Sequence, residues 1–179
     1  MTQNSVFETF PTLRTERCML NYIENSDIIS VGTLLKDKNV IRYIEAIESP
    51  LSLDETKDFI SLFQASYHNR RAILWAIRVN AVPEVLVGLI AIYQIEGQVS
   101  TELLYLLSPQ YWNQGYMNEC LRCVTQFSFD HMMIEIVRLS INKENQASII
   151  LAEKCGYIMK KVIGNEVIFE KTANNDSCS

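Results

Sequence analysis

The sequence has no apolar segment long enough to cross a membrane. Its longest apolar run, residues 85–93, falls far short of the roughly 20 residues that a spanning helix needs. Residues 1–11 contain no lysine or arginine and no apolar core segment, so we expect no secretory signal. These absences favour a cytoplasmic protein without a membrane partner.

Disulfide and metal-binding patterns are missing as well. The five cysteines are an odd and scattered set: Cys18, Cys120, Cys123, Cys155 and Cys178. Such spacing fits reduced thiols better than a disulfide framework. Cys120 and Cys123 have redox-motif spacing, but they fall inside a predicted helix without a second cysteine pair or a nearby histidine. We therefore expect two small core residues there, and no metal.

Basic charge is also scarce. Sixteen lysines and arginines stand against 21 acidic residues, which gives a net charge of −5 and a pI near 5.1. A nucleic-acid-binding domain usually has a basic face, so we expect no nucleic-acid partner. A mildly acidic surface would instead attract a cationic acceptor such as an amine. The sequence contains neither GxGxxG nor GxxxxGK[ST], which argues against dinucleotide and nucleoside-triphosphate folds.

The elements that are present predict one α+β domain. A chain of 179 residues fits a single domain, which we place at residues 1–171, with the polar segment 172–179 as a disordered tail. Alternation and apolar runs predict strands at 17–22, 73–79, 85–93, 101–107, 135–141, 157–163 and 167–171. Caps and helical periodicity predict helices at 27–36, 40–47, 52–67, 118–132 and 146–154. A meander followed by β-α-β units indicates a mixed sheet of about seven strands with helices on both faces.

The segment 103–119 has the strongest chemical signal. A strand ends near Pro109, a short turn passes Gly115, and a helix begins at once. The start of a helix points unpaired backbone N–H groups at whatever lies before it, and a glycine lets a phosphate approach closely. The segment therefore predicts a pyrophosphate site made of main-chain amides. The alternative is a strand–turn–helix connection that binds no ligand, because it would have the same sequence pattern.

Four stretches of the sequence resemble the GCN5-related N-acetyltransferases (GNAT family), most of all the branch with the ribosomal-protein-alanine N-acetyltransferases. SPQYWNQGYMNE, from Ser108 to Glu119, is similar to the acetyl-CoA loop of the family. Residues 13–20 resemble the opening L-x-T-E-R-L-x-L of that branch. Residues 75–77 with 87–90 resemble its second and third strands, and residues 142–148 with 154–157 resemble its N-x-x-S … K-x-G-F segment. They follow the family's own order across about residues 11–160.

The resemblance implies a splayed mixed sheet with acetyl-CoA as co-substrate in the V between the fourth and fifth strands. A strand with a free edge beside a helix N-terminus suits a ligand with amides at one end and phosphates at the other. Carried over by position, the pantetheine arm would meet the main chain of Tyr105, Leu106 and Leu107 and the side chain of Asn145. The pyrophosphate would meet amides of Asn113, Gln114, Gly115, Tyr116, Met117 and Asn118. The loop itself has no basic side chain, so Arg122, one turn on, is the nearest cation in the sequence.

Two residues are candidates for the chemistry. Glu102 lies in an otherwise apolar strand near the expected thioester, where partial desolvation would raise its pKa and suit it as the general base. The alternative is a solvent-exposed charge at the start of a strand. Many relatives protonate the leaving thiolate with a tyrosine, whose position here is Ala152. Ser148 matches the serine that is proposed in the ribosomal branch, and its alternative role is a local bond to the helix backbone.

The predicted function is acetyl transfer from acetyl-CoA to a primary amine, by direct attack in a ternary complex. No cysteine stands where a covalent relay would need one. The acceptor stays open between a protein N-terminus, a polyamine and another small amine, and the oligomeric state between monomer and homodimer. The alternative is a CoA-binding regulatory or scaffold protein with the fold but no turnover, which Ala152 favours and Glu102 opposes.

Overall fold

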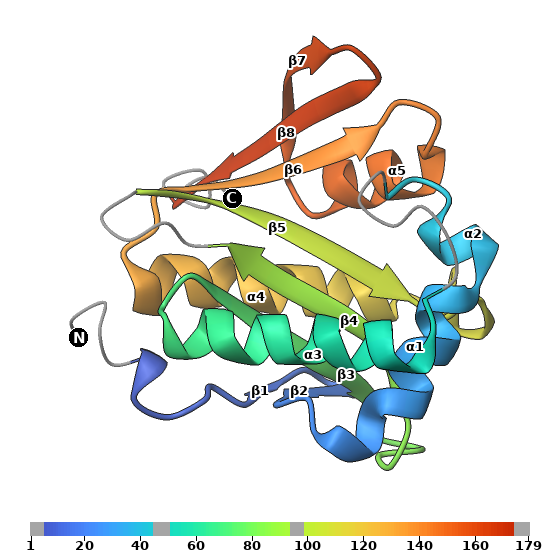
Figure 1. Ribbon diagram of the computed structural model, residues 1–179. Coiled ribbons are helices and arrows are strands. Elements are labelled where there is room, and N and C mark those ends of the chain that lie inside the picture. Colours follow the sequence, from blue (N-terminus) through green and yellow to red (C-terminus); the bar gives the residue numbers. More distant parts are fainter. Residues whose placement is uncertain (1–5, 45–50, 94–98, 174–179) are drawn as a thin grey trace.

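Eight strands form one mixed sheet in the part of the chain that the structure, a computed structural model, describes: residues 6–44, 51–93 and 99–173. Their order across the sheet is β1-β2-β3-β4-β5-β6-β8-β7 (Figure 1). The strands are β1 Leu13–Arg14, β2 Cys18–Asn21, β3 Ala72–Val79, β4 Leu86–Tyr93, β5 Ser100–Leu107, β6 Ile136–Asn142, β7 Ile158–Ile163 and β8 Glu166–Thr172. The predicted α+β class is confirmed, and all seven predicted strands are present. The short strand β1 is the one that the sequence pattern misses.

Helices cover both faces of this sheet, as predicted (Figure 1). Helices α1 (Ile28–Lys36), α2 (Lys38–Ile41) and α3 (Leu53–His68) pack on one face, and α4 (Tyr116–Met132) and α5 (Gln146–Lys154) on the other. Alternation along β3 places Leu74 in the core under α1–α3 and Trp75 in the core under α4. Because β3 and β4 are covered on both faces, their sequences are almost continuously apolar.

Several element ends differ from the sequence prediction. Helix α4 begins at Tyr116, two residues earlier than predicted, because Gly115 takes the N-cap position. Helix α2 ends at Ile41, and residues 45–47 of the longer predicted helix lie outside the described residues. Thr172 is the last residue of β8, and residues 174–179 of the predicted tail also lie outside the described part. The predicted capping box of Ser52 and Glu55 at the start of α3 is confirmed.

The sheet opens between strands β5 and β6. Strands β5 and β6 pair in parallel only from Ser100 to Glu102, opposite Ile136 to Arg138. Beyond that point β5 stays paired with β4 and β6 with β8, so the two halves of the sheet diverge into a V (Figure 1). None of the helices in the described segments is both long and apolar enough for a membrane span.

Candidate active site

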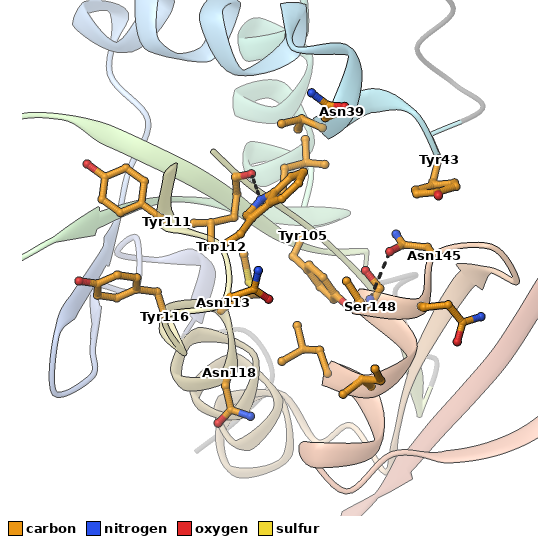
Figure 2. A pocket seen from close by; sticks show the side chains of 18 of the residues that line it. Asn39, Tyr43, Tyr105, Tyr111, Trp112, Asn113, Tyr116, Asn118, Asn145 and Ser148 are labelled. Atoms are coloured by element: carbon orange, nitrogen blue, oxygen red, sulfur yellow. Dashed lines mark hydrogen bonds between the residues drawn. The ribbon is translucent and has the colours of Figure 1, made fainter. Parts of the chain in front are cut away.

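A cavity of about 940 Å³ lies beside the end of β5, on the open side of the V (Figure 2). Its walls come from the end of α2, the end of β5, the first turn of α4, and the β6–α5 connection with α5. The structure brings all ten residues expected to contact the cofactor into this lining, together with Ser148: Tyr105, Leu106, Leu107, Asn113, Gln114, Gly115, Tyr116, Met117, Asn118 and Asn145. Residues separated by up to about forty positions in the sequence thus share one surface.

The edge of β5 that faces the V offers main-chain groups from alternate residues. The N–H of Ser108 donates to β4 at 2.8 Å, so antiparallel hydrogen-bonded pairing recurs at every second residue and includes Leu106. The main-chain groups of Tyr105 and Leu107 consequently point away from β4, toward the side from which β6 has diverged. Leu106 directs its main chain to β4, so Tyr105 and Leu107 are the members of the expected trio whose main-chain groups face the open side.

The loop after β5 turns onto the N-terminus of α4. The indole N–H of Trp112 donates to the carbonyl of Leu107 at 2.7 Å, which ties the loop to the end of the strand (Figure 2). Asn113 and Gly115 both have positive φ, at 59° and 84°. Gly115 is the N-cap of the 17-residue helix α4, and no side chain caps the helix at this end. The first-turn amides and the helix dipole can therefore act on an anion in the cavity.

An ion-pair network holds the start of α4 in place. The carboxylate of Glu119, in the first turn, accepts hydrogen bonds from Thr15 Oγ1 at 2.8 Å, Arg17 N at 3.1 Å and Arg17 Nε at 2.6 Å. Burial pushes the pKa of Glu119 up, but the bonds from Thr15 and Arg17 outweigh it, so the pKa lies below its ordinary value. The Arg17 guanidinium also lies 4.4 Å from the centre of the Tyr116 ring. The negative charge of Glu119 is thus neutralised close to the loop.

Arg122, the nearest cation to the loop in the sequence, is not part of the cavity lining. Its Nε donates to Asn118 Oδ1 at 3.1 Å, and its guanidinium donates to the main-chain carbonyl of Lys154. Arg122 therefore joins α4 to the last turn of α5. The basic residues that line the cavity are Lys154 and Arg42.

The N-terminus of α5 forms the opposite wall. Asn145 is the N-cap, and its Oδ1 accepts the N–H of Ser148 at 3.2 Å (Figure 2). The hydroxyl of Tyr105 is buried beside the side chain of Ser148. Burial raises the pKa of Tyr105 to about 12, and the neighbouring Ser148 hydroxyl opposes that rise. Ala152, where the resemblance would place a tyrosine, is fully buried.

Glu102 lies at the apex of the V and not in the cavity lining. Its side chain is exposed, on the same face of β5 as Leu106. The expectation of a partly desolvated carboxylate is therefore wrong, because the side chain of Glu102 is exposed to solvent at the start of β5.

Thiols are absent from the cavity lining of the described chain. Cys18, Cys120 and Cys155 are buried, Cys123 is half-buried, and all four are free. Within the described segments, no three histidines, cysteines, aspartates or glutamates gather closely enough to hold a metal ion.

A family model described as an acetyltransferase (GNAT) domain matches residues 17–158. The chain belongs to the GNAT acetyltransferases. The family predicted from the sequence and the predicted class of enzyme, an acyltransferase, are thereby confirmed. The match extends from β2 to the first residue of β7, and it includes the loop and both helix N-termini of the cavity.

Individual relatives of this GNAT chain agree with that assignment. YoaA of Bacillus subtilis (strain 168), an uncharacterized N-acetyltransferase, is 26% identical over 155 residues, which cover 86% of each chain. A GNAT-family acetyltransferase from Bacillus anthracis superposes with a TM-score of 0.78 at 21% identity, covering 90% of this chain and 98% of that one. RimL, a ribosomal L7/L12 alpha-N-protein acetyltransferase solved with coenzyme A, gives a TM-score of 0.81 at 15% identity, over 90% and 98%. At these identities the two structures show a shared fold.

Two features of this GNAT site were not found from the sequence. The Arg17–Glu119 pair joins residues that are 102 positions apart. The T-E-R stretch of the family resemblance includes Arg17, but it does not predict the pairing with Glu119. The bond from the Tyr43 hydroxyl to the carbonyl of Glu144, at 3.4 Å, spans 101 positions and had no signal. It joins the segment after α2 to the β6–α5 connection at the rim of the cavity.

Proposed function

We propose that this protein transfers the acetyl group of acetyl-CoA to a primary amine while both substrates are bound. The observation that carries the proposal is the placement of the free edge of β5 beside the uncapped N-terminus of α4 in one cavity. An extended strand edge binds amides, and a helix N-terminus binds phosphates, so together they match a pantetheine arm that ends in a pyrophosphate.

The residues fit such a co-substrate. Gly115 has no Cβ at the point where the loop meets α4, and a Cβ there would lie 3.0 Å from the Arg17 guanidinium. Tyr105 and Leu107 would hold the amides of the arm, and the amides of residues 113–118 would hold the pyrophosphate. Asn145 would hydrogen-bond the arm from the other wall, and Lys154 would add a positive charge near the phosphates. A bound thioester supplies an activated acetyl group.

Direct transfer needs a deprotonated amine next to the thioester. The lining has no thiol in the described chain, which supports direct attack and not a covalent relay. Glu102, exposed at the apex of the V, would accept the proton of the amine through water. Ser148 lines the cavity near the expected reaction centre.

The acceptor would enter between α2 and the β6–α5 connection, past Tyr43 and Glu144. Strand β7 beside this region is an edge strand, and all six of its residues are exposed. This openness favours the N-terminus of a protein over a small enclosed amine as the acceptor, with a polyamine as the second choice. The free thiols of the described chain support a cytoplasmic location.

Calorimetry followed by a turnover assay tests the proposal. We expect micromolar affinity for acetyl-CoA, and release of free thiol with peptides that have an unblocked N-terminus. N-terminally blocked copies of the same peptides are the matched control and should give no thiol. Lack of binding at millimolar acetyl-CoA would overturn the proposal, and firm binding without turnover for any amine would favour the regulatory alternative.

A further inference from the structure

Three thiols gather where helix α4 packs against strands β1 and β2. Cys18 lies in β2, and Cys120 and Cys123 lie one turn apart in α4. The thiols of Cys18 and Cys120 are hydrogen-bonding neighbours in the core, where the two residues are 1% and 0% exposed. The Cys123 thiol is half-buried, and its Sγ lies 3.9 Å from the carbonyl oxygen of Arg14 in β1. The two cysteines with redox-motif spacing therefore meet a third thiol from a distant part of the sequence.

The contact between Cys18 and Cys120 is held in register by the residues that precede them. The main-chain N–H and the Nε of Arg17 both donate to the carboxylate of Glu119. The N–H of Cys18 donates to Thr15 Oγ1 at 2.9 Å, and that hydroxyl donates to the same carboxylate at 2.8 Å. The β1–β2 turn and the first turns of α4 are thus fixed to each other, and the two thiols face each other in a set orientation.

The surroundings of the pair favour a thiolate at Cys18. Its hydrogen bond with Cys120, together with a bond from Thr15, lowers the pKa of Cys18 although burial opposes the change. The same bond between the thiols, together with burial, raises the pKa of Cys120. The thiolate is the nucleophile in disulfide exchange, so Cys18 is placed to attack the sulfur of Cys120 once that sulfur is oxidised.

We propose that Cys18 and Cys120 form a reversible disulfide under oxidising conditions, and that Cys123 is the thiol through which the oxidant enters. The buried pair is shielded from an oxidant in solution, whereas Cys123 is partly accessible. In a reducing compartment the three residues remain free thiols, and a disulfide that forms there reports oxidative stress.

A low-molecular-weight disulfide is the oxidant in this reaction. The Cys123 thiolate attacks one of its sulfurs, which forms a mixed disulfide and releases one thiol. Cys120, one turn earlier on α4, then attacks the Cys123 sulfur and displaces the second thiol. Cys18 finally attacks the Cys120 sulfur, and Cys123 leaves as a free thiol again. In total, two protein thiols are oxidised to one disulfide, and the oxidant is reduced to two thiols.

The disulfide would act on the proposed phosphate site, a consequence that rests on the proposed function. An S–S bond of about 2 Å is much shorter than a contact between two thiols, so its closure draws α4 toward β2. Met117 lies one turn before Cys120 and lines the cavity. The first-turn amides of α4 would therefore move, and we expect oxidation to lower acetyl-CoA affinity by about tenfold, within the usual range for coupling between two sites.

Peptide mapping tests the disulfide without a cofactor or an acceptor. The protein with Cys178→Ser keeps the four described cysteines; it is treated with oxidised glutathione, digested without reductant and analysed by mass spectrometry. We expect a linked pair of peptides that contain Cys18 and Cys120, a fall from four free thiols to two, and full reversal by dithiothreitol. Unchanged free thiols, glutathione held stably at Cys123, or a disulfide of any other pair would overturn the inference.

Substitutions in the same protein separate the roles of the three cysteines. Cys18→Ala should abolish the disulfide, and Cys123→Ser should slow its formation by about tenfold or more without changing the product. Cys155→Ser is the matched control, because Cys155 is buried as well but its thiol contacts Asn118, and its loss should leave the rate unchanged. A Cys123→Ser variant that is oxidised at the parent's rate would overturn the entry role of Cys123.

Calorimetry on the reduced and oxidised protein measures the coupling to acetyl-CoA. The oxidised form should bind about tenfold more weakly, and dithiothreitol should restore the affinity. Cys18→Ala, treated in the same way, should show no change. A disulfide that forms without altering acetyl-CoA affinity would contradict the coupling alone. A protein that forms the disulfide but binds acetyl-CoA in neither state would contradict the proposed function and keep the disulfide.

Discussion

The two ends of the cavity differ in how firmly the protein fixes them. At the end beside α4, which is the proposed phosphate site, the loop is tied to β5 through Trp112, and the first turn of α4 is tied to the β1–β2 turn through Arg17 and Glu119. At the proposed acceptor end, among the described residues, a hydrogen bond of 3.4 Å from the Tyr43 hydroxyl to the carbonyl of Glu144 joins the segment after α2 to the β6–α5 connection. The candidate base at the apex, Glu102, is exposed.

This difference fits the two tasks of such an enzyme. A co-substrate of constant structure is bound best by a preformed site, because little order has to be created on binding. An acceptor whose structure beyond the amine varies needs a cavity entrance that is open to solvent. The comparison predicts that substitutions at the acceptor end change the rate, and that those at the phosphate end change affinity or stability.

The largest effect is expected at the apex. Glu102→Gln keeps the shape of the side chain but removes the proton acceptor, so turnover near neutral pH should fall by about 10²-fold. Acetyl-CoA affinity should not change, since Glu102 does not line the cavity. The deficit should shrink toward pH 9, where free amine is abundant. Steady-state kinetics with a reactive peptide, combined with calorimetry, measures both quantities.

Glu84→Gln is the control for this charge change, because Glu84 is exposed in the turn between β3 and β4. Its kinetics should match those of the parent. If Glu102→Gln and the parent had equal rates from pH 6 to 9, Glu102 would have no part in the reaction.

A smaller effect, on affinity, is expected at the loop. Gly115→Val places a branched side chain at a φ of 84° in the phosphate site, so acetyl-CoA affinity should fall by about tenfold or more. Gly164→Val is a matched control: its φ is 60°, and a Cβ there meets nothing within 4 Å, in the β7–β8 turn. Both variants should lose some stability, but only the first should lose affinity in calorimetry. Equal affinities for the two variants would remove the phosphate site from the loop.

The smallest effect concerns stability. The pKa of Glu119 is below its ordinary value in the folded protein, so its ionisation stabilises the fold above the unfolded-state pKa of about 4.3. That contribution is lost as the pH falls through the lower folded-state pKa. Solvent screens the partly exposed Arg17, so Glu119→Gln should lower the Tm at pH 7 by only about 2–4 °C. In thermal melts the difference from the parent should shrink as the pH falls below about 4.3, and a constant difference at all pH values would contradict this account.

Most of the fold could be predicted from the sequence because its signals are local. Helix α5 has the predicted bounds, and the Ser52–Glu55 capping box lies where its spacing placed it. The run of apolar residues in β4 marks a strand covered on both faces. Strand β1 was missed because two residues have no periodicity, and its pairing depends on the turn that Thr15 and Cys18 close.

The candidate site was predictable where it is made of main chain. The loop and the N-terminus of α4 follow from one glycine and from the change of strand to helix. The environment of a side chain was not predictable, because it depends on distant elements. Glu102 is exposed at the start of β5, and the Tyr105 hydroxyl is buried beside Ser148 of α5.

The central claim is that acetyl-CoA lies along the free edge of β5 with its phosphates at α4. Backbone amide exchange, followed by NMR with and without acetyl-CoA, tests it most directly. We expect new protection at Tyr105 and Leu107 and at residues 113–118, and no change at Leu106, whose amide already bonds β4. Binding of acetyl-CoA that left these amides unprotected, or that protected Leu106 in place of its two neighbours, would contradict the account.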